Sequence, residues 1–498
     1  MFQISEMNNN QSSYRQIIKA TSIFGGVQIF QIITHIIRSK AIAILLGPAG
    51  MGIAGLLNSS ITLVTGLTNF GLGSSAVKDI ANAHGSGDIL KISTISVVLK
   101  RLILITGLFG SLVTIIFSPW ISEFTFGNRD FTFAFSWISI SVFFTQVSSG
   151  QVVLLQGMRK LEYLAKANLY GSFFGLFITI PIYYKFGING IVPSIIVSSI
   201  ISLLASWYYT RKLKIKPVDV TFRKTFSEGK SMLVFGLVIS VAALFSTIVS
   251  YLVRVVININ GGLADVGLYT AGFSIITIYL GMIFNAMATD YYPRLSEVSN
   301  DSNRYKEVIN QQAEITILIL APLLIFFFVF IRFGVIIIYS KSFLAITDMM
   351  LWAGLGMFFK ACTWPMGFLF LAKGESKIYF FNELTLHIFN LLLSIMGYKL
   401  YGLTGLGLAI FGSNLLSLMQ VVLFMKIKYD FLYNKRFMTI FFYQFIIVLI
   451  TVLLVLFVSS SINYFFGSLL VCLSLWISYT ELDKRIGLKN IFKNLKSK

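Results

Sequence analysis

Two arginines lie in stretches of the chain that are otherwise apolar enough to sit in lipid. Arg38 occurs in THIIRSKAIAILLGPAGMG (34–52), and Arg254 occurs in YLVRVVININGG (251–262). Each precedes a glycine by a similar distance, Arg38 by nine residues (47 − 38 = 9) and Arg254 by eight (262 − 254 = 8). A charge at the centre of a membrane helix costs about 2.5–3.5 kcal/mol on insertion scales, so we expect both side chains to face water or a counter-charge. The alternative, that both snorkel to lipid headgroups along their aliphatic stems, stays open.

Three more cations, Lys40, Arg332 and Lys360, lie in or near apolar runs that hold few acidic residues. A cavity with surplus positive charge suits an anionic ligand. Guanidinium groups pair with phosphate oxygens in a two-pronged geometry, so two arginines facing one cavity could together hold a diphosphate.

Acidic side chains inside apolar segments are candidates for coupling transport to a proton or sodium ion. Asp290 lies in ATDYYPR, and Glu383 lies one helical turn before His387. For each residue taken singly, a buried pair or an interfacial position is the commoner reason for such a charge. The sequence holds no metal, nucleotide or hydrolase motif, and we expect neither a metal nor a cofactor.

The composition is that of an integral membrane protein. The chain has 498 residues, of which 56% are hydrophobic and 12% charged, and its mean hydropathy is +0.81. Apolar stretches of about 20 residues recur, which predicts helices crossing a bilayer and not barrel strands. The formal charge of +20 would suggest nucleic acid in a soluble protein, but the basic residues fall in short connections, which excludes that reading.

Apolar windows and their breaks predict fourteen membrane spans. Their approximate bounds are 15–46, 52–76, 101–121, 132–157, 164–186, 188–210, 231–258, 266–292, 313–338, 344–372, 378–401, 403–426, 437–459 and 462–480.

The basic residues predict the orientation of these spans. One set of alternate connections holds most of them, including RKLKIKPVDVTFRKTFSEGK (211–230), KIKYDFLYNKR (426–436) and the tail DKRIGLKNIFKNLKSK. The opposite set holds only Arg129, Lys185, Lys341 and Lys399. The excess of Lys and Arg predicts cytoplasmic termini.

Glycine-rich landmarks predict an internal repeat. GPAGMGIAG (47–55) matches GGLADVGLYTAG (261–272) at an offset of 215 (267 − 52 = 215), and GINGI (187–191) matches GLTGL (402–406) at the same offset (402 − 187 = 215). Between them LLQGMRKLEY (154–163) matches FLAKGESKIY (370–379); aligning their glycines gives 217 (374 − 157 = 217), which predicts a two-residue indel.

The repeat predicts an all-α fold of two six-helix lobes. Because six spans per copy is an even number, the copies share one orientation and are related by a pseudo-twofold axis along the membrane normal. The predicted divisions are an N-terminal lobe (1–210), a cytoplasmic linker (211–230), a C-terminal lobe (231–426), and a region with two extra helices and a basic tail (427–498).

The chain resembles the Wzx-type flippases of lipid-linked oligosaccharides in the multidrug/oligosaccharidyl-lipid/polysaccharide exporter superfamily. The resemblance rests on ATSIFGGVQIF through RSKAIAILLGPAGMGIAGLLNSSITLVTGLTNFGLGSSAVKDIA, and on GLYTAGFSIITIY with the following YYPRLSE. Spans 13 and 14 depart from the shorter members of the superfamily, which leaves their role open.

This resemblance implies a flippase of the bacterial inner membrane. It would move an undecaprenyl-diphosphate-linked repeat unit, such as that of O-antigen, from the cytoplasmic to the periplasmic leaflet by alternating access through a central cationic cavity. Among the residues that match, the resemblance makes Arg38 and Arg254 cavity cations, with Lys78, Arg294 and Lys360 as additional contacts. We expect a monomer that meets membrane lipids, with a polysaccharide polymerase and a chain-length regulator as candidate partners.

Three other functions remain as alternatives. A cation-coupled multidrug antiporter of the same superfamily would need an anionic pocket, whereas embedded cations outnumber embedded acids here. A membrane glycan polymerase or ligase, which would be an enzyme, calls for a sizeable outer loop with catalytic charges, and the predicted outer loops are short. A scaffold without transport would leave the two similarly placed arginines unexplained.

Overall fold

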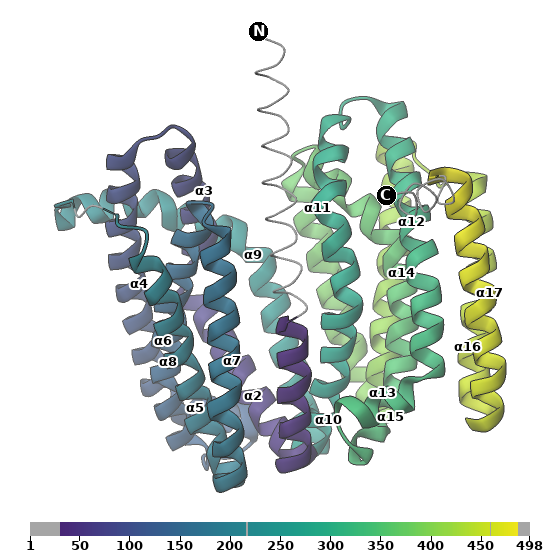
Figure 1. Cartoon of the computed structure of the whole chain (residues 1–498), viewed down its shortest axis with the longest axis horizontal. Helices are drawn as coiled ribbons and strands as arrows, with labels where there is room; N and C mark the ends of the chain where they lie inside the picture. Colours follow the sequence, from purple (N-terminus) through teal and green to yellow (C-terminus); the bar gives the residue numbers. More distant parts are fainter. Residues whose placement is uncertain (1–29, 216–217, 459, 487–498) are drawn as a thin grey trace, which may run out of the picture. The chain divides into compact units, whose positions relative to one another are not determined.

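The structure, a computed structural model, describes residues 30–215, 218–458 and 460–486. These residues are almost entirely helical and contain no strand, which confirms the all-α fold (Figure 1). Eleven helical segments among them are long and apolar enough to cross a membrane, and this count does not confirm the predicted fourteen spans. Residues 15–29 of the first predicted span, and the basic tail from 487 onward, lie outside the described residues.

The chain packs as two compact units, Met1–Gly267 and Leu268–Lys498, which we call unit 1 and unit 2. The described part of unit 1 holds a helix over residues 30–45, followed by α2 (Gly47–Thr68), α3 (Leu72–Gly85), α4 (Ile89–Ile116), α5 (Ser118–Phe126), α6 (Thr132–Gly157), α7 (Leu161–Phe186), α8 (Ile191–Arg211) and α9 (Phe222–Gly261). α10 (Leu263–Ser274) crosses the division. Unit 2 continues with a π-helical segment (Ile275–Leu280), α11 (Gly281–Glu297), α12 (Ser302–Val329), α13 (Ile331–Ile338), α14 (Thr347–Ala372), α15 (Ser376–Tyr429), α16 (Lys435–Phe457) and α17 (Ser460–Ile486).

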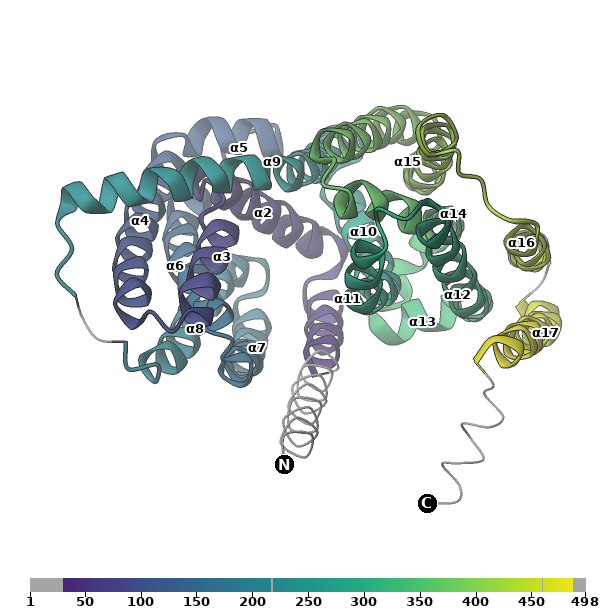
Figure 2. The same cartoon turned by 90° about the horizontal axis from the view of Figure 1, so that it is seen from above.

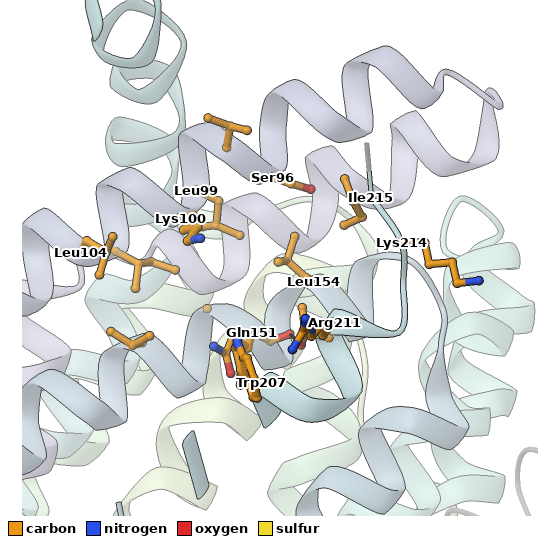
Figure 3. A pocket seen from close by; sticks show the side chains of 15 residues that line it. Ser96, Leu99, Lys100, Leu104, Gln151, Leu154, Trp207, Arg211, Lys214 and Ile215 are labelled. Carbon is orange, nitrogen blue, oxygen red and sulfur yellow. Dashed lines mark hydrogen bonds between the residues drawn. The ribbon is translucent and has the colours of Figure 1, made fainter. Parts of the chain in front are cut away.

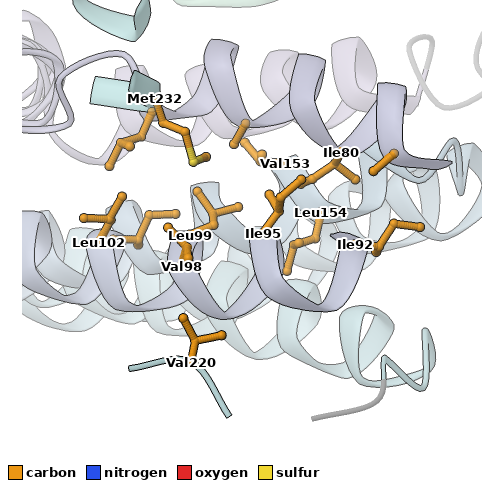
Figure 4. Close-up of a cluster of buried hydrophobic side chains, with 14 residues drawn as sticks. Ile80, Ile92, Ile95, Val98, Leu99, Leu102, Val153, Leu154, Val220 and Met232 are labelled. Atoms are coloured by element: carbon orange, nitrogen blue, oxygen red, sulfur yellow. The ribbon is translucent and has the colours of Figure 1, made fainter. Parts of the chain in front are cut away.

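In unit 1, α6 packs against both α4 and α8, and the three helices lie side by side (Figure 2). At one end of unit 1 the buried side chains of α3, α4 and α6 meet Val220, from the segment before α9, and Met232 of α9 (Figure 4). This cluster includes Leu72, Ile80, Val98, Leu99 and Val153. It fixes the relative positions of the helices that line the cavities of this unit.

The second predicted span is interrupted. α2 ends at Thr68 and α3 begins at Leu72, and the residues between them include Phe70 and Gly71, which both have positive φ values of 50° and 67°. A non-glycine residue with positive φ is uncommon, so the surroundings must hold this break in place. The corresponding span of the second repeat is interrupted differently, by the π-helical segment Ile275–Leu280.

Repeat-related glycines share an unusual backbone conformation. Gly187, between α7 and α8, has φ 54° and ψ −133°, while Gly402, inside α15, has φ 57° and ψ −136°. Both values lie in a region that only glycine enters at low cost. Gly187 divides α7 from α8, and Gly402 breaks α15 at the predicted boundary between its two spans. The two glycines are 215 residues apart, as the repeat predicted.

The predicted two-residue indel is wrong. The turn before α7 and the turn before α15 contain the same backbone hydrogen bonds at an offset of 215: Lys160 N donates to Leu155 O at 2.9 Å, and Glu375 N donates to Phe370 O at 2.8 Å. Arg159 has φ 53°, and its counterpart Gly374 has φ 71°. Aligning glycine with glycine misplaced the register, because an arginine fills the left-handed position in the first copy.

Another repeat-related pair of glycines allows two helices to approach closely. A Cβ atom on Gly52 of α2 would lie 1.9 Å from the carbonyl oxygen of Leu263, and one on Gly267 of α10 would lie 1.8 Å from that of Pro48. The two contacts are reciprocal across the offset of 215, so α2 and the part of α10 in unit 1 meet through equivalent backbone surfaces.

The two helices outside the repeat pack against α12. Both α16 and α17 contact α12 and each other, and Figure 2 shows these two helices beside each other. Between them the buried Gln444 donates to the hydroxyl of Ser478 at 3.0 Å and accepts from that of Ser474 at 2.7 Å. These hydrogen bonds satisfy polar groups that would otherwise be costly inside an apolar helix pair.

Candidate functional site

Arg38 lines two polar cavities in unit 1. Its Nη2 donates a long hydrogen bond to Ser198 Oγ of α8, at 3.5 Å. One cavity has a volume of about 280 Å³ and the other about 410 Å³, and they share Arg38, Ser148, Val152, Ser198 and Ser202. We call these two the Arg38 cavities. The guanidinium group thus lies against open space lined by hydroxyl groups.

The lining of the Arg38 cavities is rich in neutral polar groups. The first holds Gln31, Thr34, His35, Asn168, Ser172 and Ser206 beside the shared residues, and the second holds Asn58, Thr62, Ser141, Thr145, Ser149 and Ser199. Among the described residues, neither lining includes Asp or Glu, and the titratable side chains of the two linings are Arg38 and His35. A cation among hydroxyl and amide donors can bind the oxygen atoms of a phosphate group.

The polar surface extends to the break between α2 and α3. A third cavity of about 280 Å³ includes Asn69 and Gly71 of the break, and reaches Ser240 and Thr247 of α9. It shares Thr62, Thr145 and Ser149 with the larger Arg38 cavity. All three cavities belong to unit 1, so one continuous set of small polar side chains crosses this unit.

Arg254 lies on α9, also within unit 1, and is half-buried. Its Nη1 donates to the carbonyl oxygen of Ser250 at 2.7 Å and to the hydroxyl of the same residue at 2.5 Å. Ser250 and Arg254 are four positions apart on α9, so the guanidinium group is held against its own helix. No contact described in the structure joins Arg254 to Arg38.

The other cations implied by the resemblance occupy different surroundings. Lys78 on α3 is exposed, with its Nζ 4.1 Å from the centre of the Phe235 ring. Arg294 on α11 donates from Nη2 to Gln312 Oε1 at 3.1 Å, while its Nε is buried without a hydrogen-bond partner in the structure. Within the described part of unit 1, neither Lys78 nor Arg254 lines the Arg38 cavities.

Lys360 of unit 2 lies close to an acidic residue. On α14 it interacts electrostatically with Glu383 and His387 of α15, and its Nζ is 5.7 Å from the centre of the Phe284 ring. His387 Nε2 is 3.9 Å from Glu383 Oε2. We call these three residues the Lys360 cluster; it combines two of the predicted coupling residues with one predicted substrate contact.

Asp290, the remaining coupling candidate, is exposed on α11. The structure gives no contact between Asp290 and the Lys360 cluster among the described residues. Nor does any group of three or more His, Cys, Asp or Glu side chains in the described part of the chain have the geometry of a metal site.

The sequence interpretation missed the hydroxyl residues that surround Arg38. On α8, serines recur every fourth residue at Ser194, Ser198, Ser202 and Ser206. Residues four apart share one face of a helix, so this spacing marks a polar face on an otherwise apolar helix. The signal was present in the sequence and identifies the element opposite Arg38.

Residues 41–348 match the model of a family described as "Polysaccharide biosynthesis protein". Among curated proteins, a putative O-antigen transporter of Shigella flexneri is 27% identical over 292 residues, covering 56% of this chain and 66% of the relative, just under two thirds of its length. The lipid III flippase of Escherichia coli (strain K12) is 20% identical over 351 residues, covering 70% of this chain and 83% of the relative.

Solved structures show the same fold. Lipid II flippase MurJ in an inward closed conformation gives a TM-score of 0.68 at 14% identity, over 94% of this chain and 99% of that one. An inward-facing multidrug resistance MATE family transporter of the MOP superfamily gives a TM-score of 0.62 at 18% identity. That match covers 81% of this chain and 94% of the transporter. The solved structures confirm the fold class. The family match and the curated relatives confirm the resemblance to O-antigen transporters and lipid III flippases.

Proposed function

Since the chain belongs to the polysaccharide biosynthesis protein family, we propose that it moves a lipid-linked oligosaccharide across a membrane. The substrate is an undecaprenyl-diphosphate-linked repeat unit of O-antigen or a related surface polysaccharide. It passes from the cytoplasmic to the periplasmic leaflet of the bacterial inner membrane, in a protein whose termini are cytoplasmic. The family and the relatives named as an O-antigen transporter and lipid III flippases support this substrate class.

One observation carries the proposal: Arg38 faces two cavities whose described lining residues supply many hydroxyl and amide groups and no carboxylate. A guanidinium group in such surroundings gains a charge-assisted interaction when a phosphate oxygen arrives. A cationic drug would instead place like charges together. The geometry therefore favours an anionic head over the substrate of a multidrug antiporter.

The neutral part of the lining suits the glycan. Sugar hydroxyl groups exchange hydrogen bonds with water for hydrogen bonds with serine, threonine, asparagine and glutamine side chains at little net cost. The polyprenyl tail needs no such cavity, since it can stay in the hydrocarbon of the bilayer. The protein's task is to lower the large penalty for carrying charged and polar groups through that hydrocarbon.

Alternating access through a cationic cavity completes the proposed mechanism. Arg38 supplies the cation for the diphosphate, and Arg254 becomes a second contact if its guanidinium group exchanges the Ser250 carbonyl for a phosphate oxygen. Lys78 and Arg294 stay candidates for contacts along the path, and Asp290 stays a candidate for ion exchange. A polysaccharide polymerase and a chain-length regulator are the proposed partners of a monomeric transporter.

Coupling to a proton or sodium ion would lie in the Lys360 cluster. Glu383 and His387 form a titratable pair 3.9 Å apart, and Lys360 adds a charge that a bound cation would have to compete with. Changes in protonation of the pair would alter the balance of charge within α14 and α15. A sodium ion or proton could drive the cycle by that route.

The proposal is tested in a strain that lacks the gene. We expect lipid-linked oligosaccharide to accumulate on the cytoplasmic leaflet, and expect the wild-type chain to relieve this accumulation. Arg38→Ala should fail to restore transport and Arg254→Ala should restore it weakly. Arg129→Ala, which removes an exposed arginine paired with Glu123 at 2.9 Å, is the control and should restore transport fully.

Two results would contradict this account. Absence of accumulation in the deletion strain would exclude a flippase. Full rescue by both Arg38→Ala and Arg254→Ala, at wild-type protein levels in the membrane, would exclude the cationic mechanism while leaving the flippase intact.

A further inference from the structure

A fourth cavity of unit 1 combines an apolar wall with basic side chains (Figure 3). It has a volume of about 430 Å³ and lies where α4, α6 and the end of α8 meet the segment that follows α8. None of its lining residues belongs to the three polar cavities described above. We call it the basic pocket.

The apolar wall of the basic pocket is part of a fixed core. Leu99, Ile103 and Leu154 line the pocket and also belong to the buried cluster between α3, α4 and α6 (Figure 4). Val97, Leu104, Val147 and Ile215 extend this wall. A preformed aliphatic surface of this kind suits hydrocarbon chains, because they bury apolar area without ordering the protein further.

Three cations, Lys100, Arg211 and Lys214, line the same pocket, and the lining residues that the structure describes include no Asp or Glu. All three side chains belong to exposed residues, and none of them takes part in an ion pair within the described part of the chain. Their charges are therefore available to an anion that enters the pocket.

Trp207 and Arg211 at the basic pocket form a pair typical of membrane surfaces. Trp207 is 48% exposed, and the Arg211 guanidinium carbon lies 5.3 Å from the centre of its ring. Gln151 also lines the pocket (Figure 3). Its Oε1 accepts a hydrogen bond from the hydroxyl of Ser206 at 2.6 Å, which fixes the amide. Tryptophan and basic residues together are typical of the level of the lipid headgroups.

We propose that the basic pocket binds an anionic phospholipid of the cytoplasmic leaflet. Its phosphate diester lies against Lys100, Arg211 and Lys214, and the upper part of its acyl chains lies along Leu99, Ile103 and Leu154. The pocket is at the end of α8 that the distribution of basic residues predicts to be cytoplasmic. A free phosphate ion would satisfy the cations but would leave the apolar wall uncovered, so the lipid is the better match.

The bound lipid has a structural consequence. It joins α4, α6 and α8 to the linker residues Lys214 and Ile215 at the point where the chain leaves the membrane. Anionic lipid would therefore hold the end of α8 and the start of the linker against unit 1. This role is independent of the substrate proposed above, since it uses other residues.

Quenching of Trp207 fluorescence tests the proposal in the full-length purified chain. The chain is mixed with phosphatidylglycerol or phosphatidylcholine whose acyl chains carry bromine, at equal mole fractions in detergent. Since the chain has 6 tryptophans, the signal of Trp207 is taken as the difference between wild type and Trp207→Phe. We expect brominated phosphatidylglycerol to quench this signal at much lower mole fraction than brominated phosphatidylcholine.

A charge-matched pair of variants sharpens the test. The triple variant Lys100→Gln, Arg211→Gln, Lys214→Gln should raise the phosphatidylglycerol concentration needed for half-maximal quenching by about 100-fold, as expected for three basic residues near anionic lipid. The control removes three exposed cations that do not line the pocket, through Lys91→Gln, Lys160→Gln and Lys230→Gln. This control variant should leave the phosphatidylglycerol concentration for half-maximal quenching unchanged.

Each alternative gives a different result. Equal quenching by the two brominated lipids, or an equal loss in both triple variants, would overturn the proposal, because either would show that no specific headgroup site exists. Displacement of brominated phosphatidylglycerol by inorganic pyrophosphate at micromolar concentration would also overturn it and would indicate a site for the phosphate groups alone.

Discussion

The Arg38 cavities of unit 1 and the Lys360 cluster of unit 2 place a buried or half-buried cation in opposite surroundings. Arg38 faces hydroxyl and amide groups with no carboxylate in the lining, whereas Lys360 interacts with Glu383. This difference in acidic neighbours indicates that the two cations have different roles. A cation without an acidic neighbour suits the binding of an external anion, and a cation with an acidic and an imidazole neighbour suits internal charge balance.

The first way to break this contrast is to give Arg38 an acidic neighbour. Ser198→Asp would place a carboxylate next to Arg38, because Ser198 Oγ is 3.5 Å from its Nη2. The internal ion pair would compete with a substrate diphosphate, and we expect transport to fall about 10- to 100-fold, as for loss of a hydrogen bond to a charged group. The measurement is the rate of release of lipid-linked oligosaccharide from the cytoplasmic leaflet.

Ser198→Asn is the matched control, since it adds a side chain of the same shape without the charge. It should keep most of the transport rate. Equal losses in the Asp and Asn variants would show that the size of the side chain, and not its charge, disturbs this cavity.

The second way is to remove the acidic neighbour in unit 2. Glu383→Gln leaves Lys360 without its carboxylate, which we expect to destabilise the protein by about 1–3 kcal/mol through loss of a charged partner. It should also abolish the dependence of transport on pH or sodium ion concentration while sparing the affinity for diphosphate. Thermal unfolding in detergent and transport assays over a range of pH would measure the two effects.

Glu383→Gln combined with Lys360→Met provides the control, because it removes both charges. The double variant should recover part of the stability lost in the single variant but none of its ion dependence. An unchanged ion dependence in both variants would exclude the Lys360 cluster as the coupling site.

The smallest expected effect concerns the equivalent turns of the two repeats. Arg159 occupies a left-handed position with φ 53°, where its counterpart Gly374 has φ 71°. We expect Arg159→Gly to stabilise the protein by about 0.5–1 kcal/mol, since glycine adopts this conformation without a steric penalty. Gly374→Ala should destabilise it by a similar amount, and thermal unfolding of the two variants measures both. A loss of stability in Arg159→Gly would show that the arginine side chain, and not the backbone, determines this turn.

Much of the fold could be predicted from local sequence signals. Apolar stretches indicated the helices. The glycines at 187 and 402 indicated where the chain changes direction, because the backbone conformation at these positions requires glycine, which the sequence shows directly. The two-residue indel was predicted wrongly because residue identity was followed where Arg159 takes the place of a glycine. The break at Phe70 and Gly71 could not be recognised in the sequence, since the apolar residues around it resemble those of a continuous span.

The candidate site could be predicted only in part. Arg38 was evident because a charge in an apolar stretch is costly. The serines of α8 that surround it are common in membrane helices, and only their spacing of four marks a face. Arg254 donates hydrogen bonds to Ser250 on its own helix, and the approach of Glu383 to Lys360 depends on how α14 packs against α15. Such contacts follow from packing and not from position along the chain.

The most direct test of the central claim is the affinity of the purified chain in lipid nanodiscs for undecaprenyl diphosphate. We expect Arg38→Ala to weaken binding about 10- to 100-fold, and Lys360→Ala to leave it within about twofold, since the described residues that line the Arg38 cavities include no carboxylate, whereas Lys360 interacts with Glu383. Equal affinities of wild type and Arg38→Ala, or a larger loss in Lys360→Ala, would contradict the account.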